Sequence, residues 1–351
     1  MSSDQPKSAW FGQKAISSLR GIWNVRSKQS HHKLSPLPET SIERLTSPKE
    51  KTILYLAYGS NLARETFQGT RGVKPLSSVN VHAPTLALTF DLPGIPYLEP
   101  CFANTRYRDP SSDPPSESPG YHKDRWHKGL VGVVYEITPE DYRTIIATEG
   151  GGAGYQQVVV PCYALAKDDI VAPIPSGTPF KAHTLLQPRD HSEMDAGEIE
   201  VKNTSRPIQR QDPSYAQPSA RYLKLLTDGG EEHSLPSEYL AYLYNIRPYT
   251  ITTFRQRIGR TIFLTSWIPI VMTFMGLGKI LADKKGKMPT WMVPIMGALF
   301  KGLWGSYDVF FKRPFGDGER TMNEQKDEGR WLEEASPEWL DEKTRQAAIV
   351  I

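Results

Sequence analysis

KTILYLAYGSNL, residues 51–62, is the stretch that most constrains the fold, because its apolar run ends abruptly at Gly59-Ser60-Asn61. Such a run predicts a buried β-strand that enters a tight turn. Successive backbone amides and two short polar side chains in a turn form a suitable cradle for a carboxylate or a phosphate. An ordinary Gly-Ser-Asn turn is the competing interpretation of the same residues.

Further strands follow along the chain, at TLALTFDLP (residues 85–93), GLVGVVYEIT (129–138) and QVVVPCYAL (157–165). The segment SARYLKLLTDGGEEHSLPSEYLAYLYNI (219–246) resumes helical spacing and predicts two helices joined by a Gly-Gly turn. Polar, Pro- and Ser-rich stretches near 106–128 and 186–218 predict loop insertions. Strands mixed with a few helices within about 200 residues predict one α+β, barrel-like domain over 51–250.

A helix signature precedes Glu149. Thr138-Pro139-Glu140-Asp141 supplies a threonine N-cap, a proline at the first helical position and an acid at the third. The predicted helix ends at Glu149, just before three glycines, so this carboxylate lies at the negative end of the helix dipole. A carboxylate in that environment suits a general base. A solvent-exposed glutamate at a helix C-cap is the alternative.

The composition limits the functional classes. The chain has 351 residues, with 42 basic and 39 acidic side chains and a net charge of +3, which gives no case for a nucleic-acid partner. Its two cysteines, Cys101 and Cys162, form neither a disulfide scaffold nor a four-cysteine zinc site. They are expected to be small core residues rather than a redox pair. With no apolar leader in its first residues, the sequence predicts a cytoplasmic protein.

The charge is distributed unevenly outside the domain. Residues 1–50 form a +4 tail, predicted to be largely disordered, in which a short amphipathic helix over 11–23 suggests either membrane targeting or a partly ordered extension. Residues 251–313 carry a net charge of +8 around two uncharged runs, 261–278 and 289–300. This extension predicts either membrane contact through 261–300, as a spanning helix or as an interfacial or re-entrant hairpin on an anionic membrane, or a helical pair that packs onto the domain. Residues 314–351 form a −5 tail.

Taken in order, AYGSNL, GLVGVVYEIT with its following helix ending in Glu149-Gly150, Tyr155 and LPSEYLAYL resemble the γ-glutamylcyclotransferase family. The resemblance covers roughly residues 52–250. It is to the fungal branch of the family, which includes proteins of sulfur-containing toxin pathways such as that of gliotoxin.

The resemblance implies a small mixed β-barrel, flanked by helices, in which the turn binds the α-carboxylate of a γ-glutamyl substrate. Glu149 matches the family's catalytic acid, which acts as a base on the substrate's α-amino group, so that 5-oxoproline and an amine are released. No metal and no cofactor are implied. The residues that carry over as substrate-binding are Tyr58, Gly59, Ser60, Asn61, Leu62 and Tyr155.

The sequence departs from the family pattern at two positions. Tyr155 stands one residue closer to Glu149 than in the animal enzymes, and the second pocket tyrosine, expected near His183-Thr184-Leu185, is absent. We therefore expect a bulkier γ-glutamyl adduct as substrate, such as a glutathione conjugate. A noncatalytic binding or membrane-tethering protein that retains the fold is the rival hypothesis.

The loop before residue 129 contains weaker candidates for a site. His122 and His127 flank Asp124 with a spacing that a metal site also shows, but a solvated loop is the favoured interpretation. Trp126 is expected to be either a binding lid or an exposed loop anchor.

Overall fold

The computed structural model describes residues 37–46, 51–108, 123, 125–149, 155–165, 170–187, 210–281 and 288–322. From Pro38 onward the chain forms one compact unit. Several predicted features lie outside the described residues: the helix over 11–23, most of both loop insertions, the glycines after Glu149, His122 with Asp124, and most of the acidic tail.

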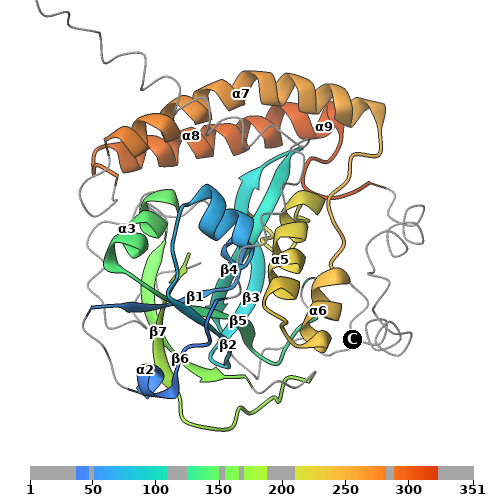
Figure 1. Cartoon of the computed structure of the whole chain (residues 1–351). Coiled ribbons are helices and arrows are strands. Elements are labelled where there is room, and N and C mark those ends of the chain that lie inside the picture. The colour runs from blue at the N-terminus through green and yellow to red at the C-terminus, as the bar shows by residue number, and fades with distance from the viewer. Residues whose placement is uncertain are drawn as a thin grey trace, which may run out of the picture. The chain divides into compact units, whose positions relative to one another are not determined.

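Five strands close into a barrel in the order β1-β5-β2-β6-β7. Strand β1 pairs antiparallel with β5 and parallel with β7, and the remaining neighbours are antiparallel. Side chains alternate along β6, where Val158, Val160 and Cys162 are buried. The predicted α+β class with a barrel is thereby confirmed (Figure 1). The strands are β1 (Ile53–Ala57), β2 (Ser77–Ala83), β5 (Leu130–Ile137), β6 (Gln156–Ala164) and β7 (Phe180–Leu186).

A separate two-stranded ribbon is formed by β3 (Leu86–Ile95) and β4 (Glu99–Tyr107). Tyr97, in the turn between them, has a φ of 63°. This left-handed conformation costs a bulky residue about 1–2 kcal/mol. Burial of the ring, and a hydrogen bond that its hydroxyl donates to the Gly316 carbonyl at 2.8 Å, offset that cost.

The helices beside the barrel follow the local sequence signals, with one correction. Thr138 caps α3 (Pro139–Thr148) as predicted, accepting a hydrogen bond from the Asp141 amide at 3.1 Å. The predicted Gly-Gly turn is wrong, because α5 (Ala220–Glu232) continues through Gly229 and Gly230. The chain turns only afterwards, before α6 (Ser237–Tyr244). A short helix, α2 (Ile42–Thr46), is tied to the barrel by Arg44, which pairs with Glu136 of β5 at 2.7 Å.

Beyond Thr250, two long helices run antiparallel beside each other (Figure 1). They are α7 (Phe254–Ile280) and α8 (Met292–Ser306), and α8 continues as a π-helical segment (Tyr307–Phe311) into α9 (Lys312–Phe315). Thr253 and Gln256 form a capping box at the start of α7, and the helix passes through Pro269 without ending.

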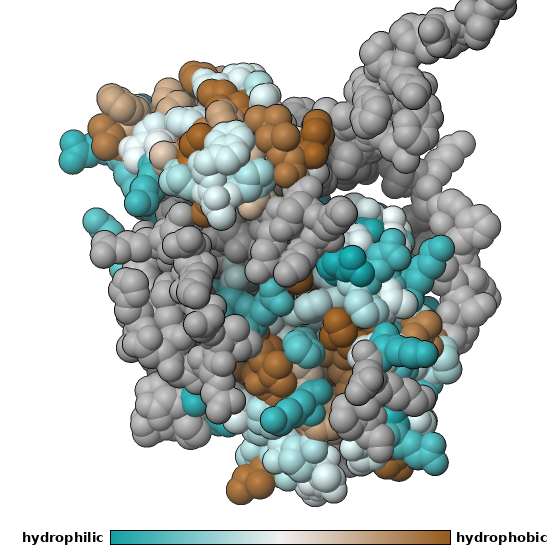
Figure 2. Space-filling view, turned by 90° about the vertical axis from the view of Figure 1, so that its left-hand side faces the viewer, coloured by the Kyte–Doolittle hydropathy of each residue, from teal (hydrophilic) through white to brown (hydrophobic). Residues whose placement is uncertain are grey.

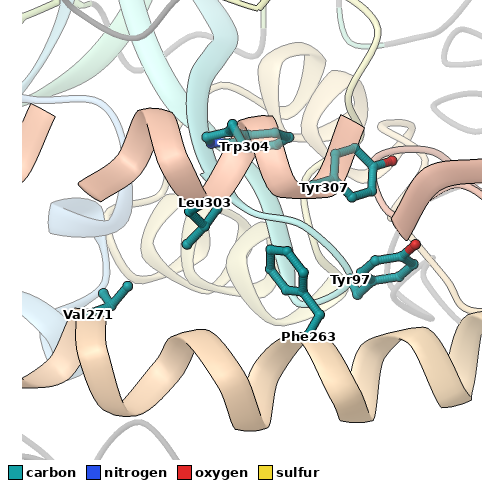
Figure 3. Packing of buried hydrophobic residues seen from close by; sticks show 6 residues of the cluster. All are labelled: Tyr97, Phe263, Val271, Leu303, Trp304 and Tyr307. Carbon is teal, nitrogen blue, oxygen red and sulfur yellow. The ribbon is translucent and has the colours of Figure 1, made fainter. Parts of the chain in front are cut away.

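A buried hydrophobic cluster joins α7 and α8 to the tip of the β3–β4 ribbon (Figure 3). The predicted packing of a helical pair onto the domain therefore holds for the inner face of this pair. Cys101 and Cys162 are buried and free, as expected for core residues. The cluster consists of Tyr97, Phe263, Val271, Leu303, Trp304 and Tyr307.

Candidate active site

The YGSNL stretch forms a tight turn at the end of β1. Residues Ser60–Leu62 make one turn of 3-10 helix, which begins with the Leu62 amide donating to the Gly59 carbonyl at 2.9 Å. The amides of Ser60 and Asn61 precede that bond and so have no partner within the turn. The turn therefore presents adjacent N–H groups of the kind that bind a carboxylate.

Two glycines allow neighbouring elements to approach this turn closely. A Cβ atom at Gly59 would lie 3.2 Å from the Tyr222 hydroxyl of α5 and 3.6 Å from the Ala103 side chain of β4. A Cβ atom at Gly229 of α5 would lie only 2.4 Å from the backbone carbon of Leu62. Helix α5 thus packs backbone to backbone against the turn, while the β3–β4 ribbon lies beside it.

Glu149 is held against the turn at the C-terminus of α3. Its amide donates to the Ile145 carbonyl at 2.9 Å, and its Oε1 atom accepts a hydrogen bond from Asn61 Nδ2 at 3.2 Å. Arg71 forms an ion pair with the same Oε1 atom and also donates to Thr148. The Oε2 atom makes no hydrogen bond with any residue that the structure describes. One carboxylate oxygen is thus anchored, and the other is left for a ligand.

The charge of Glu149 contributes to the raised pKa of four tyrosines. Burial, followed by the charge of Glu149, raises the pKa of both Tyr55 and Tyr155 above the ordinary value for a phenol. Burial also raises the pKa of Tyr58 and Tyr222, with a smaller contribution from Glu149. All four phenols are consequently neutral near pH 7 and can act as hydrogen-bond donors.

The predicted binding residues take different positions in this site. The Tyr58 hydroxyl donates to the Leu185 carbonyl of β7 at 2.6 Å, and Leu62 is fully buried. Asn61 also donates to the Tyr55 hydroxyl at 2.9 Å, while its buried Oδ1 has no partner among the described residues. Tyr155 is partly buried and immediately precedes β6.

Sequence reasoning missed Arg71, Tyr55 and Tyr222. Arg71 follows a π-helical segment (Glu65–Thr70) whose sequence shows no pattern that would indicate a site. Tyr222 fits the apolar face of a predicted helix, and nothing in the sequence indicates a further role for it. His183, where a second pocket tyrosine was expected, is half-buried on β7 and packs edge-on against Tyr142 with ring centroids 5.7 Å apart.

A histidine lies on the other side of the turn. His233, at the C-cap of α5, has its Nε2 atom 2.7 Å from the Tyr135 hydroxyl. Burial, aided by the charge of Arg64, lowers the pKa of His233 to about 4. The imidazole is therefore neutral at physiological pH, and its partner Tyr135 also donates to the Leu62 carbonyl at 3.4 Å.

Trp126 is neither a lid nor an exposed anchor. Its side chain is buried, its indole N–H donates to the Gly129 carbonyl at 2.6 Å, and its ring packs against Tyr239 and Tyr242 of α6. Trp126 thus fixes the chain entering β5 from within the core.

One family model matches part of the chain. It is described as the AclK C-terminal domain and covers residues 253–313, the segment that contains α7 and α8.

Curated relatives match most of the chain. The chain is 30% identical over 268 residues to γ-glutamyl cyclotransferase gliK of Aspergillus fumigatus, covering 76% of this chain and 89% of that protein. It is 29% identical over 285 residues to γ-glutamyl cyclotransferase aclK of Aspergillus oryzae, covering 77% and 91%. A solved γ-glutamyl cyclotransferase aligns with a TM-score of 0.37 and 18% identity, over 58% of this chain and 92% of that one.

Proposed function

The chain belongs to the γ-glutamylcyclotransferase family, and we propose that it cyclises a γ-glutamyl group to 5-oxoproline and releases the attached amine. The observation that carries this proposal is the contact between Glu149 and Asn61 at 3.2 Å, which joins a carboxylate to the turn that presents free amides. A noncatalytic protein with the same fold would have no need to hold an acid at this point.

In the proposed reaction the turn binds the α-carboxylate of the γ-glutamyl group through the amides of Ser60 and Asn61. The neighbouring α-ammonium then meets the free Oε2 atom of Glu149, and Asn61 Oδ1 is a second acceptor for it. Both roles use atoms that have no partner among the described residues.

Glu149 removes a proton from the α-ammonium, and the resulting amine attacks the γ-carbonyl carbon. A carbon–nitrogen bond forms within a five-membered ring, and the bond from that carbon to the leaving nitrogen breaks. Glu149 gives this proton to the departing nitrogen, and the ring nitrogen loses its remaining extra proton, so that 5-oxoproline leaves with one lactam N–H and the amine leaves as its ammonium ion. Because the nucleophile is tethered to its electrophile, the reaction gains a high effective molarity without a nucleophilic side chain.

Release of 5-oxoproline from γ-glutamyl compounds tests this proposal, with the parent compared to Glu149→Gln. We expect the variant, which keeps the shape of the side chain but cannot accept the proton, to lose about 10²–10⁴-fold in kcat. An active Glu149→Gln variant would contradict the site assignment. Failure of the folded parent to act on any γ-glutamyl compound would instead favour a noncatalytic binding or tethering protein.

We further propose that the substrate is a bulky γ-glutamyl adduct, such as a glutathione conjugate formed in fungal secondary metabolism. Two observations support this proposal. His183 stands where the family pattern has a pocket tyrosine, and the γ-glutamyl cyclotransferases that the chain resembles come from fungi. Comparing kcat/KM for a glutathione S-conjugate with that for simple γ-glutamyl dipeptides tests the choice. Equal or better turnover of the dipeptides would count against it.

We also propose that residues 261–300 contact a membrane and that the protein is otherwise cytoplasmic. Among the described residues, α7 is the one helix long and apolar enough to cross a bilayer, with a mean hydropathy of 1.6 over an 18-residue window within Phe254–Gly278. The two free cysteines fit a reducing compartment. Fractionation of cell membranes, comparing the full-length parent with Ile262→Glu, tests the contact: we expect the parent in the membrane fraction, and a parent found entirely in the soluble fraction would contradict the proposal.

A further inference from the structure

The inner face of α7 packs against the rest of the protein. Phe263 and Val271 point toward α8 and the ribbon tip (Figure 3). Gln256 is completely buried and donates from Nε2 to the Asp317 carbonyl at 2.7 Å. A Cβ atom at Gly259 would lie only 2.5 Å from Phe315. For α7 to cross a bilayer alone, it would have to leave all of these contacts.

The outer face of α7 is an uninterrupted stripe without charge. Residues spaced by three and four from Phe254 to Ile280 share one side of the helix, and both end residues are more than 70% exposed. Apolar surface also gathers over the α7–α8 pair at the top of the molecule as seen in Figure 2. The stripe consists of Phe254, Ile258, Ile262, Thr265, Pro269, Met272, Gly276 and Ile280.

The hydroxyl groups on the exposed side of α7 are already satisfied within the helix. Thr265, Ser266 and Thr273 each donate to the carbonyl four residues earlier at 2.8 Å, and Thr261 does so at 3.0 Å. Such back-bonding leaves no side-chain donor that needs water. This face can therefore enter a low-dielectric layer without leaving polar side-chain groups unpaired.

The charged residues within α7 and α8 all have one sign. Arg255, Arg257 and Arg260 are exposed at the start of α7, and Lys301 is exposed on α8. None of them forms an ion pair within the described part of the chain, and α7 contains no acidic residue. The acid in the following segment, Asp308, is paired with Arg210 at 2.8 Å. The arrangement of an apolar stripe with a basic rim complements an anionic lipid surface.

We infer that the α7–α8 pair binds an anionic bilayer in the plane of the interface, with the outer stripe of α7 in the acyl boundary and its arginines among the phosphates. This inference rests on the proposed membrane contact and specifies the lipid and the geometry. A second copy of the chain is a poorer occupant, because a symmetric contact would bring the arginine clusters of both copies together.

Vesicle flotation of the full chain tests the lipid preference. We expect at least about ten-fold tighter binding to vesicles with about one third phosphatidylserine than to neutral ones, and about five-fold weaker binding for each arginine changed to glutamine. Ile262→Glu should abolish binding, whereas Val159→Glu, which alters an exposed apolar residue on β6, should not. Both variants should retain the parent's 5-oxoproline release, which shows that they fold.

Depth measurements test the geometry. Phe254→Cys, Ile262→Cys and Gly276→Cys, each labelled with a fluorophore, should be quenched to similar extents by shallow nitroxide lipids if α7 lies in the plane. Depth that changes steadily along the helix, or equal binding to neutral and anionic vesicles, would overturn this inference and leave the membrane contact standing. Failure to bind any vesicle would overturn both the in-plane geometry and the membrane contact. A chain that forms a concentration-dependent dimer and binds no vesicle would overturn them as well. Neither result would affect the assignment of the enzyme.

Discussion

The two oxygens of Glu149 have different surroundings, and the difference depends on Arg71. The ion pair and the Asn61 hydrogen bond both fall on Oε1, so they fix the carboxylate and leave Oε2 without a hydrogen bond among the described residues. Arg71 also offsets the negative end of the α3 dipole, where a carboxylate would otherwise be disfavoured. Arg71 is thus a positioning residue for the proposed base.

Replacing Arg71 should therefore affect turnover more than binding. We expect Arg71→Met to lower kcat by about 10²-fold, because a catalytic group displaced by about 1 Å loses roughly that factor. Arg71→Lys should recover part of the loss, since it restores the charge but not the two-pronged geometry. Steady-state kinetics separate kcat from KM.

Arg143→Met is the matched control for this substitution. Arg143 is exposed on α3 and contacts only the Pro139 carbonyl among the described residues, so its loss should leave kcat unchanged. Full turnover by Arg71→Met would refute the positioning role.

Among individual residues, the sequence predicted the position of Glu149 but not the residues that contact it. Glu149 follows a contiguous N-cap signature, so its position at a helix end could be read locally. Arg71 lies 78 residues earlier, and only the closed barrel brings it to Glu149. Tyr222 approaches Gly59 from a helix whose pattern indicated an ordinary apolar face. Contacts of this kind have no local signature.

Among the elements, α5 packs directly against the backbone of the YGSNL turn. A Gly-Gly pair usually marks a turn, and sequence analysis interpreted it so, yet here α5 passes through both glycines. The physical reason is the contact at Gly229, where a side chain would collide with the Leu62 backbone at 2.4 Å. The requirement for glycine is tertiary and not visible in the neighbouring residues.

Gly229→Ala should consequently destabilise the protein and distort the turn. We expect a loss of about 3 kcal/mol in the free energy of unfolding, together with a fall in 5-oxoproline release. Gly297→Ala in α8 is the control, since nothing lies within 4 Å of its added Cβ atom. That variant should be neutral or stabilised by up to about 1 kcal/mol. Urea unfolding measures both, and similar values for the two would disprove the packing argument.

The end of α5 also makes stability depend on pH. The folded pKa of His233 is about 4, below its ordinary value of 6.5, so the folded state favours the neutral ring. The contribution of neutral His233 to the free energy of unfolding is complete above pH 6.5. It is lost as the pH falls toward 4, because His233 of the unfolded chain takes up a proton at a higher pH than His233 of the folded chain. The loss amounts to about 3 kcal/mol. His233→Gln should flatten this part of the stability profile, as measured by urea unfolding between pH 7.5 and pH 4.5.

Other histidines contribute to the same profile, so the comparison must be between parent and variant. Burial lowers the pKa of His82 and of His183 as well. These two remain in His233→Gln, and the difference between the two profiles therefore isolates His233. Identical profiles would show that His233 is not buried as described.

The strands that sequence analysis found are those with long apolar runs, and the missed ones are β2, β4 and β7. Strand β4 reads EPCFANTRY and carries buried polar residues that are satisfied by tertiary partners. Glu99 pairs with Arg221 at 2.6 Å, and Asn104 donates to the Gln187 carbonyl at 3.0 Å. Without those partners in view, the stretch resembles a loop.

In the molecule as a whole, Tyr97 joins the barrel side to the helical pair. Its ring packs edge-on against Phe263 and Tyr307, and its amide donates to the Gly318 carbonyl at 2.8 Å. We expect Tyr97→Ala to cost about 3–5 kcal/mol in the free energy of unfolding. Tyr97→Phe, which loses only the hydroxyl, should cost about 1 kcal/mol.

Hydrogen exchange locates the effect of these substitutions. In Tyr97→Ala, amides of α7 and α8 should exchange faster together with those of the β3–β4 ribbon, because one cluster stabilises all of them. Faster exchange confined to the ribbon would show that the helical pair is stable independently.

The ribbon has a consequence for how such a protein can be divided or recombined. One part of it, at Ala103, lies beside Gly59 of the YGSNL turn, and its tip is buried among helices that come more than 150 residues later in the chain. The sequence becomes basic and apolar after residue 250. A protein cut at that point would keep Tyr97 in its left-handed conformation but lose the residues of α7 and α8 that bury its ring. A gene fusion or domain exchange at that point would therefore destabilise the β3–β4 ribbon and the side of the candidate site that it forms. The ribbon tip would have to be redesigned together with the junction.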